Sequence, residues 1–317
     1  MKPQIKPRAV LLSKRANVFY LEHVRVMQKD DRVVYLTDTG SDIEQFFNIP
    51  ERNTAFLLLG KGSSLTDAAA RKLADSNVVI GFCGSGGSPL FCAADMTFLT
   101  TQSEYRPTEY MQGWMRLWLD DAKRVAAAKR MLKKRLEWTL ASWSADAELL
   151  RRKIGLDDAL VRWFENGIDH AATTSDLLSL EGAWAKRLYA RLAEGFRLAD
   201  FKREEGKGSH ESREDDVNGF LDHGNYIAYG YAAVTLNGLG ISFALPLLHG
   251  KTRRGGLVFD VADLVKDAYV MPLAFARGSA GVKQQAFRNE LIERFHDANI
   301  LDQLFTLSLI HISEPTR

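Results

Sequence analysis

The hydrophobic pattern of the chain changes character at about residue 100. Before that point, short segments rich in Val, Leu, Ile, Phe and Tyr alternate with clusters of Gly, Asp and Ser. β-Branched and aromatic side chains favour extended backbone, and Gly, Asp and Ser favour turns, so this pattern predicts strands joined by tight connections. The predicted strands cover residues 9–13, 17–28, 32–38, 54–60 and 77–84.

Two amphipathic segments interrupt these strands, at residues 42–48 and 64–76. Both are predicted to be helical. In the second, Ser64 or Thr66 can cap the helix, because a side-chain oxygen at that position accepts a hydrogen bond from an otherwise unpaired backbone N–H. The first hundred residues therefore predict a small β-rich domain with one or two helices.

The rest of the chain follows the helical period. From residue 109 to 141, Met111, Trp114, Met115 and Trp118 recur at helical spacing, and the opposite face is basic. The cations of that face are Lys123, Arg124, Arg130, Lys133 and Lys134. Further helical patterns cover 145–167, 175–200, 217–239, 261–277 and 281–306. The charged stretch 201–216 has no apolar period and is predicted to be a mobile loop.

These patterns predict an α+β protein with two domains. A small N-terminal β-rich domain with its linker is expected at 1–102, and a larger all-α domain that carries the functional site at 103–306. Residues 307–317, LSLIHISEPTR, are similar to the translation of a transposase adapter used in sequencing libraries. We therefore expect a non-native tail there, with the native sequence diverging after Thr306.

The composition narrows the function classes. A length of 317 residues suits about two domains, and the net charge is only +2, so a nucleic-acid surface would need local clustering of cations. Cys83 and Cys92 do not have the spacing of a zinc site, and two cysteines are too few for a disulfide scaffold. No signal-peptide core and no run of about 18 apolar residues occurs, which predicts a cytoplasmic protein with no membrane partner.

Glu181 lies on an apolar stripe of the predicted helix 175–200. Leu177, Trp184 and Leu188 occupy the same stripe at i, i+7 and i+11 relative to Leu177, and Glu181 falls at i+4. A carboxylate in that position loses hydration, at a cost of several kcal/mol unless a cation compensates. The compensating group is either a metal ion or an Arg from a neighbouring helix, and the sequence leaves both open.

A second cluster of polar residues lies between positions 249 and 267. His249 ends an apolar segment, which fits either a hydrogen-bonded core histidine or a ligand. Asp260, Asp263 and Asp267 share one face of the following predicted helix and repel one another unless a cation lies among them. The alternative is a solvated acidic face near a helix N-terminus, where the helix dipole favours negative charge.

One Glu, one His and one Asp form a hard, mixed oxygen and nitrogen ligand set. That set suits Mg²⁺ or Mn²⁺ rather than structural zinc. Lys251, Arg253 and Arg254 adjoin it, and such cations suit phosphate groups. A metal beside phosphate-binding cations indicates phosphodiester chemistry.

Longer motifs around these residues resemble a known family. HGNYIAYGYAAVTLNGLGI from residue 223, LLHGKTRRGGLVFDVADLVKDA from residue 247 and LSLEG from residue 178 are similar to the CRISPR-associated integrase of spacer acquisition. This family is CRISPR-associated protein one, and the resemblance is to its type I-F form. QSEYRPTEYMQGW and FCGSGGSPLF also resemble type I-F segments. The resemblance extends from the start of the chain to about Thr306.

The resemblance implies an N-terminal β-domain that forms a homodimer and an all-helical domain with a metal site. Carried onto this sequence, the Mg²⁺ or Mn²⁺ ligands and catalytic residues are Glu181, His249 and Asp263. Asp260 is expected to be a neighbour of the site rather than a certain ligand. Tyr229 resembles a tyrosine that family members hold near the scissile phosphate.

The implied reaction is direct transesterification that inserts short double-stranded DNA, the protospacer, into the CRISPR repeat array. The implied partner is CRISPR-associated protein two, in type I-F as its fusion with the helicase-nuclease protein three. Two alternatives stay open: a metal-dependent endonuclease that acts on branched or single-stranded DNA, and a non-catalytic DNA-binding scaffold.

Overall fold

The structure of the chain is a computed structural model. It describes the residue ranges 10–37, 45–82, 97–99, 108–198, 200–204, 212–249 and 255–313, with no account of the side chains in 97–99 and 309–313. The chain divides into two compact units, with the main division between residues 105 and 106.

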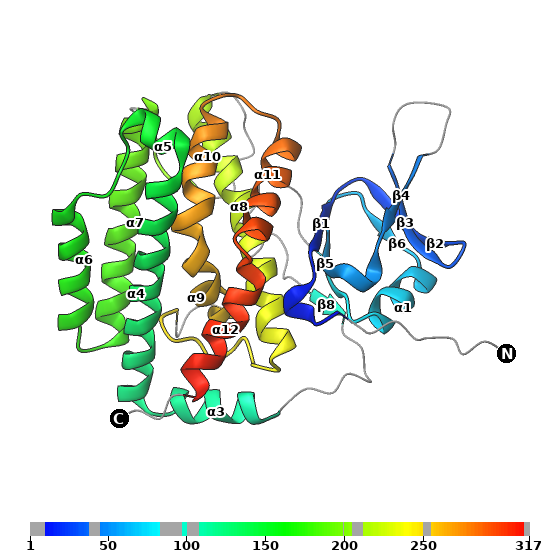
Figure 1. Cartoon of the computed structure of the whole chain (residues 1–317), viewed down its shortest axis with the longest axis horizontal. Helices are drawn as coiled ribbons and strands as arrows, with labels where there is room; N and C mark the ends of the chain where they lie inside the picture. Colours follow the sequence, from blue (N-terminus) through cyan, green and yellow to red (C-terminus); the bar gives the residue numbers. More distant parts are fainter. Residues whose placement is uncertain are drawn as a thin grey trace. The chain divides into compact units, whose positions relative to one another are not determined.

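The first unit contains two four-stranded sheets (Figure 1). One has the strand order β1-β5-β7-β8, with β1, β5 and β7 parallel and β8 antiparallel. The other has the order β4-β3-β2-β6. Their bounds are β1 Asn17–Leu21, β2 Val24–Lys29, β3 Arg32–Thr37, β4 Gln45–Ile49, β5 Thr54–Leu59, β6 Ser64–Leu65, β7 Val79–Phe82 and β8 Thr97–Leu99.

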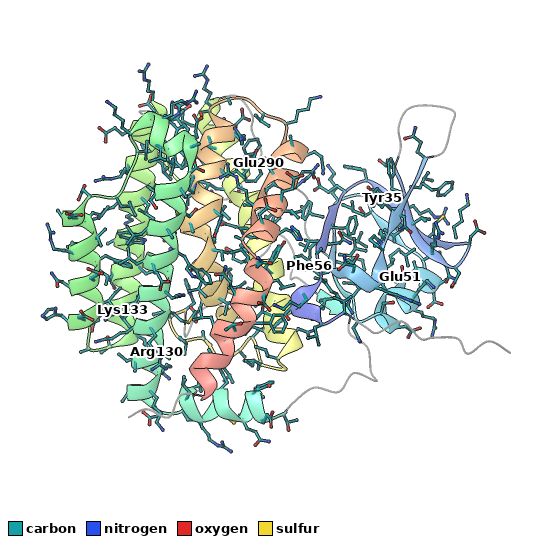
Figure 2. All side chains as sticks on the ribbon, viewed as in Figure 1. Tyr35, Glu51, Phe56, Arg130, Lys133 and Glu290 are labelled. Atoms are coloured by element: carbon teal, nitrogen blue, oxygen red, sulfur yellow. The ribbon has the colours of Figure 1, made fainter. Side chains whose placement is uncertain are left out.

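A single apolar cluster joins these sheets to helix α1, Asp67–Asp75. Every residue of β5 is buried, as expected for the interior strand of a parallel sheet, and Figure 2 marks Phe56 on it. Ala69 and Leu73 of α1 pack into the cluster, and the Thr66 side chain caps the helix through the N–H of Ala69. The expectation of a small β-rich domain is confirmed.

Three details of the predicted strand pattern are wrong. The segment 17–28 forms two strands that belong to different sheets, β1 and β2, and His23 between them adopts a positive φ of 54°. The described part of 42–48 belongs to strand β4, where pairing with β3 overrides a weak helical period. The described part of 9–13 contributes only to a 3-10 turn at Leu12–Lys14.

The second unit is helical, as predicted, and none of its described helices combines the length and apolarity needed to cross a bilayer. Its helices are α3 Thr108–Trp118, α4 Asp121–Ala145, α5 Ala147–Arg152, α6 Asp158–His170, α7 Thr174–Phe196, α8 Arg213–Gly238, α9 Gly256–Val265, α10 Met271–Gly278, α11 Gln284–Asp297 and α12 Ile300–Ser313. The helices α4, α6 and α7 lie side by side, and α3 crosses the ends of α4 and α12 (Figure 1).

An aspartate and a serine cap set two helix boundaries that the hydrophobic period alone does not predict. Asp120 accepts the N–H of Lys123 and starts α4, so the segment 109–141 is two helices and not one. Ser212 caps α8 through the N–H of Asp215, which makes 213–216 the first helical turn and not a loop. Acidic residues in that turn suit the positive end of the helix dipole.

Helix α8 is buried along nearly its whole length and packs against α9, α10, α11 and α12. A helix buried on all sides has no amphipathic stripe, which fits its place among α9, α10, α11 and α12 (Figure 1). The core of the unit therefore surrounds α8. Helix α9, which carries Asp263, packs directly against α8, whereas α7, which carries Glu181, packs against α4, α6 and α10.

One π turn, Lys266–Val270, joins α9 to α10. Within it the N–H of Met271 bonds to the carbonyl of Lys266, a spacing of five residues. Two side chains of α4 bind carbonyls of this turn: Trp143 donates its Nε1 proton to Asp267 O at 2.8 Å, and Ser142 donates to Ala268 O at 2.6 Å. The π turn is thus held against α4.

Helix α12 continues without interruption from Ile300 to Ser313. It crosses Thr306, the point after which an adapter-like tail is expected, and Ser308 beyond that point is buried. The fold has no boundary there, so the origin of residues 307–317 stays a prediction from the sequence.

Candidate metal centre

Glu181 is presented by α7, whose start is set by a capping box. The Thr173 side chain accepts the N–H of Asp176, and the Asp176 carboxylate accepts the N–H of Thr173. From this start, Leu177, Trp184 and Leu188 are completely buried, as the apolar stripe predicts. Glu181 follows the same stripe but keeps 13% of its side chain exposed.

The buried Arg135 of α4 meets Glu181. Its Nη1 lies 2.7 Å from Glu181 Oε1 and 4.0 Å from Asp263 Oδ2. The same guanidinium binds Asp267 with two bonds, from Nε to Oδ2 at 2.6 Å and from Nη2 to Oδ1 at 2.8 Å. Asp267 Oδ2 also accepts the Nε1 proton of Trp184 at 2.8 Å. The sequence left two groups open as the partner of Glu181, a metal ion or an Arg from a neighbouring helix. The structure places an Arg there.

The loop that ends in His249 is fixed from two sides. Two tryptophans of α3 hold its backbone: Trp114 donates to Leu245 O at 2.9 Å and Trp118 to Pro246 O at 2.8 Å. At the start of α9, Gly255 adopts φ 72°, and a Cβ on Gly256 would lie 2.9 Å from the His249 carbonyl oxygen. The pair of glycines thus permits the start of α9 to approach the His249 backbone closely.

The completely buried carboxylate of Asp260 organises the end of this loop. Its Oδ2 accepts the N–H groups of Leu247 and Leu248, and its Oδ1 accepts the N–H of His249 at 3.2 Å. The same Oδ1 lies 2.7 Å from His249 Nδ1. This contact assigns the Nδ1 proton to the Asp260 bond and leaves Nε2 with its lone pair. Asp260 therefore orients His249.

Asp263 lies one helical turn after Asp260 on α9. Its Oδ1 forms an ion pair with Lys266, and its Oδ2 lies 3.9 Å from His249 Nε2. The acidic residues of this helix are buried, so the alternative of a solvated acidic face is wrong. Lys266 is the cation beside Asp263 and Arg135 the cation beside Asp267, whereas Asp260 bonds to His249 and the loop backbone.

Opposite charges set the protonation of this cluster. Burial disfavours the charged form of His249, but the hydrogen bond with Asp260 and the charge of Asp263 outweigh it and raise the imidazole pKa. Burial favours a neutral Asp263, but Lys266, Arg135 and His249 hold the pKa of that carboxyl below its usual value. Despite burial, the pKa of Lys266 is raised chiefly by Asp263, and the pKa of Arg135 by Asp267, Glu181 and Asp263. Asp263 is therefore ionised and both cations charged at neutral pH.

Each of the three predicted ligands has one donor atom held by a protein partner and a second donor beside it. Glu181 Oε1 bonds to Arg135, Asp263 Oδ1 pairs with Lys266, and His249 Nδ1 bonds to Asp260. No hydrogen bond within the described residues engages Glu181 Oε2. The three side chains keep 10–14% of their surface exposed, whereas Asp260 and Asp267 are sealed. Solvent thus reaches the predicted ligands but not the two sealed carboxylates.

The charge of the cluster suits a divalent cation. Four carboxylates, those of Glu181, Asp260, Asp263 and Asp267, face two permanent cations, which leaves two negative charges when His249 is neutral. Two donors of one Mg²⁺ ion, each about 2.1 Å from it, lie at most about 4.2 Å apart, and His249 Nε2 and Asp263 Oδ2 fall within that limit. In the described part of the chain, however, no three His, Cys, Asp or Glu side chains already have the arrangement of a formed metal site. The donor chemistry fits Mg²⁺ or Mn²⁺, with Arg135 now between Glu181 and Asp263.

Tyr229 of α8 lies beside this cluster. Its hydroxyl is 3.4 Å from Lys266 Nζ, which also lies 5.0 Å from the centre of its ring, and the ring packs edge-on against Phe259. Tyr229 thus approaches the Asp263 carboxylate through Lys266. The predicted phosphate-binding cations Lys251, Arg253 and Arg254 lie outside the described residues.

The predicted basic face of α4 is partly neutralised. Lys133 pairs with Asp169 at 2.7 Å and Lys134 with Glu137 at 2.7 Å. Figure 2 labels Lys133 and Arg130 in the half of α4 nearer to α3. Cations that already have carboxylate partners attract DNA phosphates less than isolated ones, so this face is a weaker phosphate surface than its sequence suggests.

Arg135 and Lys266 are the candidate functional residues that the sequence reasoning missed. Lys266 is three positions after Asp263, so the helical spacing that grouped the aspartates would also have placed a cation among them. Arg135 follows two lysines of the basic face, and nothing in the local pattern distinguishes it from them. Its partners lie 46 and 132 residues away.

A model of the family described as CRISPR associated protein Cas1 matches residues 19–294 of the chain. Over 304 residues, the chain is 44% identical to the CRISPR-associated endonuclease Cas1 of Pseudomonas aeruginosa, covering 93% of this chain and 92% of that protein. The chain belongs to the Cas1 family. It is also 43% identical to the CRISPR-associated endonuclease Cas1 of Pectobacterium atrosepticum, covering 93% of this chain and 91% of that one.

Solved structures share the fold of this Cas1-family chain at lower identity. A TtCas1–DNA complex matches with a TM-score of 0.68 and 22% identity, covering 95% of this chain and 94% of that one. A casposase bound to integration product matches with a TM-score of 0.72 and 14% identity, covering 95% and 91%. A Cas6-RT-Cas1–Cas2 complex matches with a TM-score of 0.65 and 12% identity, covering 93% of this chain and 34% of that one.

Proposed function

We propose that this chain is a spacer-acquisition integrase that uses Mg²⁺ or Mn²⁺ to insert short double-stranded DNA into a CRISPR repeat array. The observations that support the proposal are that Arg135 lies between Glu181 and Asp263, and that Asp263 lies beside His249, in a member of the Cas1 family. Glu181, His249 and Asp263 would hold the ion. The bound ion would supply polarisation of the phosphoryl group and charge stabilisation at the attacking and leaving oxygens.

The side chains themselves supply orientation and charge. Asp260 keeps the Nδ1 proton of His249 and thereby presents Nε2 to the ion site. Lys266 holds one oxygen of Asp263 and leaves the other toward His249. Because a 3′-hydroxyl of the incoming DNA is the nucleophile in direct transesterification, no protein side chain needs to form a covalent intermediate.

We assign Lys251, Arg253 and Arg254 to the phosphates of the DNA, which cations bind without reading the base sequence. Tyr229 is assigned a place near the scissile phosphate. The casposase of similar fold is described as bound to integration product, which supports joining rather than cleavage alone. The TtCas1–DNA complex supports DNA as the partner.

The proposed assembly is a homodimer of the type I-F form. Its partner would be CRISPR-associated protein two, as the fusion with the helicase-nuclease protein three, and a structural neighbour occurs in a complex with Cas2. Co-purification of the chain with that fusion protein, followed by measurement of the mass of the complex, tests this part. A monomer that does not bind the fusion would contradict it.

The second candidate function is a metal-dependent endonuclease that acts on branched or single-stranded DNA. The names of the Pseudomonas and Pectobacterium relatives favour it. Both candidates use the same site, and a non-catalytic scaffold would use neither the ion nor His249.

An integration assay separates these functions. A labelled protospacer and a repeat plasmid are incubated with the chain, with and without Mn²⁺. We expect joined product only with Mn²⁺ and none from His249→Ala, which should still bind DNA. His296→Ala is the matched control, because His296 is an exposed histidine of α11 far from any predicted ligand in sequence. Cleavage without joining would favour the endonuclease, binding alone the scaffold, and wild-type joining by His249→Ala would remove the site assignment.

A further inference from the structure

Arg135 is part of a ring of hydrogen bonds that starts at the Glu181 side chain and returns to the same helix at Trp184. Arg135 bonds to Glu181 and to Asp267, and Asp267 bonds to Trp184, which lies three positions after Glu181 on the same helix. Glu181 and Trp184 belong to α7, Arg135 to α4 and Asp267 to the π turn. Three separate elements are thus joined around one side chain.

The anchor of this ring is rigid. The planar guanidinium of Arg135 matches the two oxygens of Asp267 with two nearly parallel bonds, an arrangement that a single-point cation cannot reproduce. The backbone carbonyl of Asp267 is in turn bonded by Trp143, from the same helix as Arg135. Helix α4 therefore holds both partners of the Arg135–Asp267 pair.

Glu181 needs an external support more than the other two predicted ligands. Its side chain has one more rotatable bond than aspartate, and a Cβ added at the neighbouring Gly182 would meet no side chain or other element within 4 Å among the described residues. His249 is oriented by the adjacent Asp260, and Asp263 by Lys266 one turn away. The only described hydrogen bond of the Glu181 side chain is the one from Arg135.

We propose that Arg135 is a positioning residue that binds Oε1 of Glu181 and holds Oε2 toward the ion site, both before and after the ion binds. The inference rests on the proposed function, because it assigns Arg135 a role toward the ion held by Glu181, His249 and Asp263. Arg135 touches neither the ion nor the DNA in this role. It acts through Glu181, with Asp267 and Trp184 as its support.

The test measures Mn²⁺ affinity of the full-length chain by isothermal titration calorimetry, together with circular dichroism and thermal unfolding in EDTA. Arg135→Lys keeps the positive charge but loses the planar fork, so it cannot bind Asp267 with two bonds and reach Glu181 as well. We expect its Mn²⁺ affinity to fall by roughly tenfold or more, the usual cost of removing a group that orients a ligand. Arg294→Lys is the matched control, because Arg294 also bridges two carboxylates, Asp146 and Glu290, without contact with the predicted ligands. Its Mn²⁺ affinity is expected to equal that of the wild type.

Folded Arg135→Lys with Mn²⁺ affinity within twofold of the wild type, or higher, overturns the inference. If Arg135→Lys does not fold, a crystal structure of the Mn²⁺-loaded wild type decides: an intact Arg135–Glu181 bond supports the inference, and a Glu181 that has left Arg135 overturns it. Failure of the proposed function has a different signature. In that case the wild type does not bind Mn²⁺, or His249→Ala binds it as well as the wild type does.

Discussion

The two sides of the candidate metal centre are built by different means. On the His249 side, the residue that orients the imidazole, Asp260, is 11 positions away, and the same carboxylate binds the loop backbone. On the Glu181 side, the orienting Arg135 is 46 positions away, and its anchor Asp267 is 132 positions from Arg135. One side is therefore a local structure of a loop and a helix start, and the other depends on the packing of α4, α7 and the π turn.

This difference determines what a substitution on each side should damage. A change on the local side disturbs a loop and one ligand. A change on the remote side leaves a charge in the protein interior, since Arg135 and Asp267 are 3% and 0% exposed. Loss of a buried charge on the remote side should therefore cost more stability than a change on the local side, while changes on either side should weaken ion binding.

The largest effect is expected for Asp267→Ala. It leaves Arg135 buried with only Glu181 as a close partner, and breaking a buried ion pair costs about 3–5 kcal/mol. Urea denaturation in EDTA, followed by circular dichroism, measures the free energy of unfolding. The control is Asp169→Ala, which breaks the exposed pair with Lys133 and should cost little stability, because solvent screens exposed ion pairs. Equal losses in the two variants would contradict the comparison.

Asp260→Asn should affect the ion more than the fold. The amide keeps the size of the carboxylate but loses its charge toward His249 and an acceptor for the N–H groups of the loop. We expect Mn²⁺ affinity to fall by about 10- to 100-fold, because orienting partners of histidine ligands contribute in that range. Calorimetric titration gives the affinity. A loss of stability without a loss of affinity would show that Asp260 stabilises the loop but does not orient His249 for ion binding.

Gly256→Ala sharpens the comparison at the local side. The added Cβ would lie 2.9 Å from the His249 carbonyl oxygen and 3.0 Å from Pro246 Cβ, so the loop must shift. Overpacking of this kind costs typically about 1–3 kcal/mol, and the shift should also weaken Mn²⁺ binding. Thermal unfolding and titration of the same preparation test both. Unchanged values would mean that the loop moves without effect on His249.

The smallest effect is expected for Gly182→Ala, next to Glu181. A Cβ there meets nothing within 4 Å among the described residues, and Ala is about 1 kcal/mol better than Gly inside a helix. The variant should therefore be more stable by about that amount. Its strand-joining rate should equal that of the wild type. A lower rate in the stabilised variant would show that Gly182 has a role toward DNA.

The local side could be predicted from the sequence because its signals are close together. The glycine pair, the histidine and the aspartates occupy one short stretch. On the remote side, the helical period predicted only that Glu181 lies on an apolar stripe, and that stripe is buried. Both interpretations of Glu181 required a cation, because a buried carboxylate needs one wherever its partner lies in the sequence. The predicted metal ligation itself awaits measurement.

The remote side could not be predicted because tertiary packing decides it. Arg135 has the same local context as Lys133 and Lys134, yet it turns inward to Asp267 while the lysines pair with Asp169 and Glu137. The strand β4 was missed for a similar reason, since its pairing with β3 outweighs its local pattern. The break before α4 was missed although Asp120, a strong cap, marks it.

The π turn at Lys266–Val270 also limits how the length of this region can vary in evolution. Side chains can be exchanged there without changing the helical phase on either side. Loss or gain of a single residue would instead rotate Asp263 by roughly 100° relative to α10, because each residue of an α-helix advances the phase by that angle. The length of this segment therefore constrains the site in addition to the identities of Lys266 and Asp267.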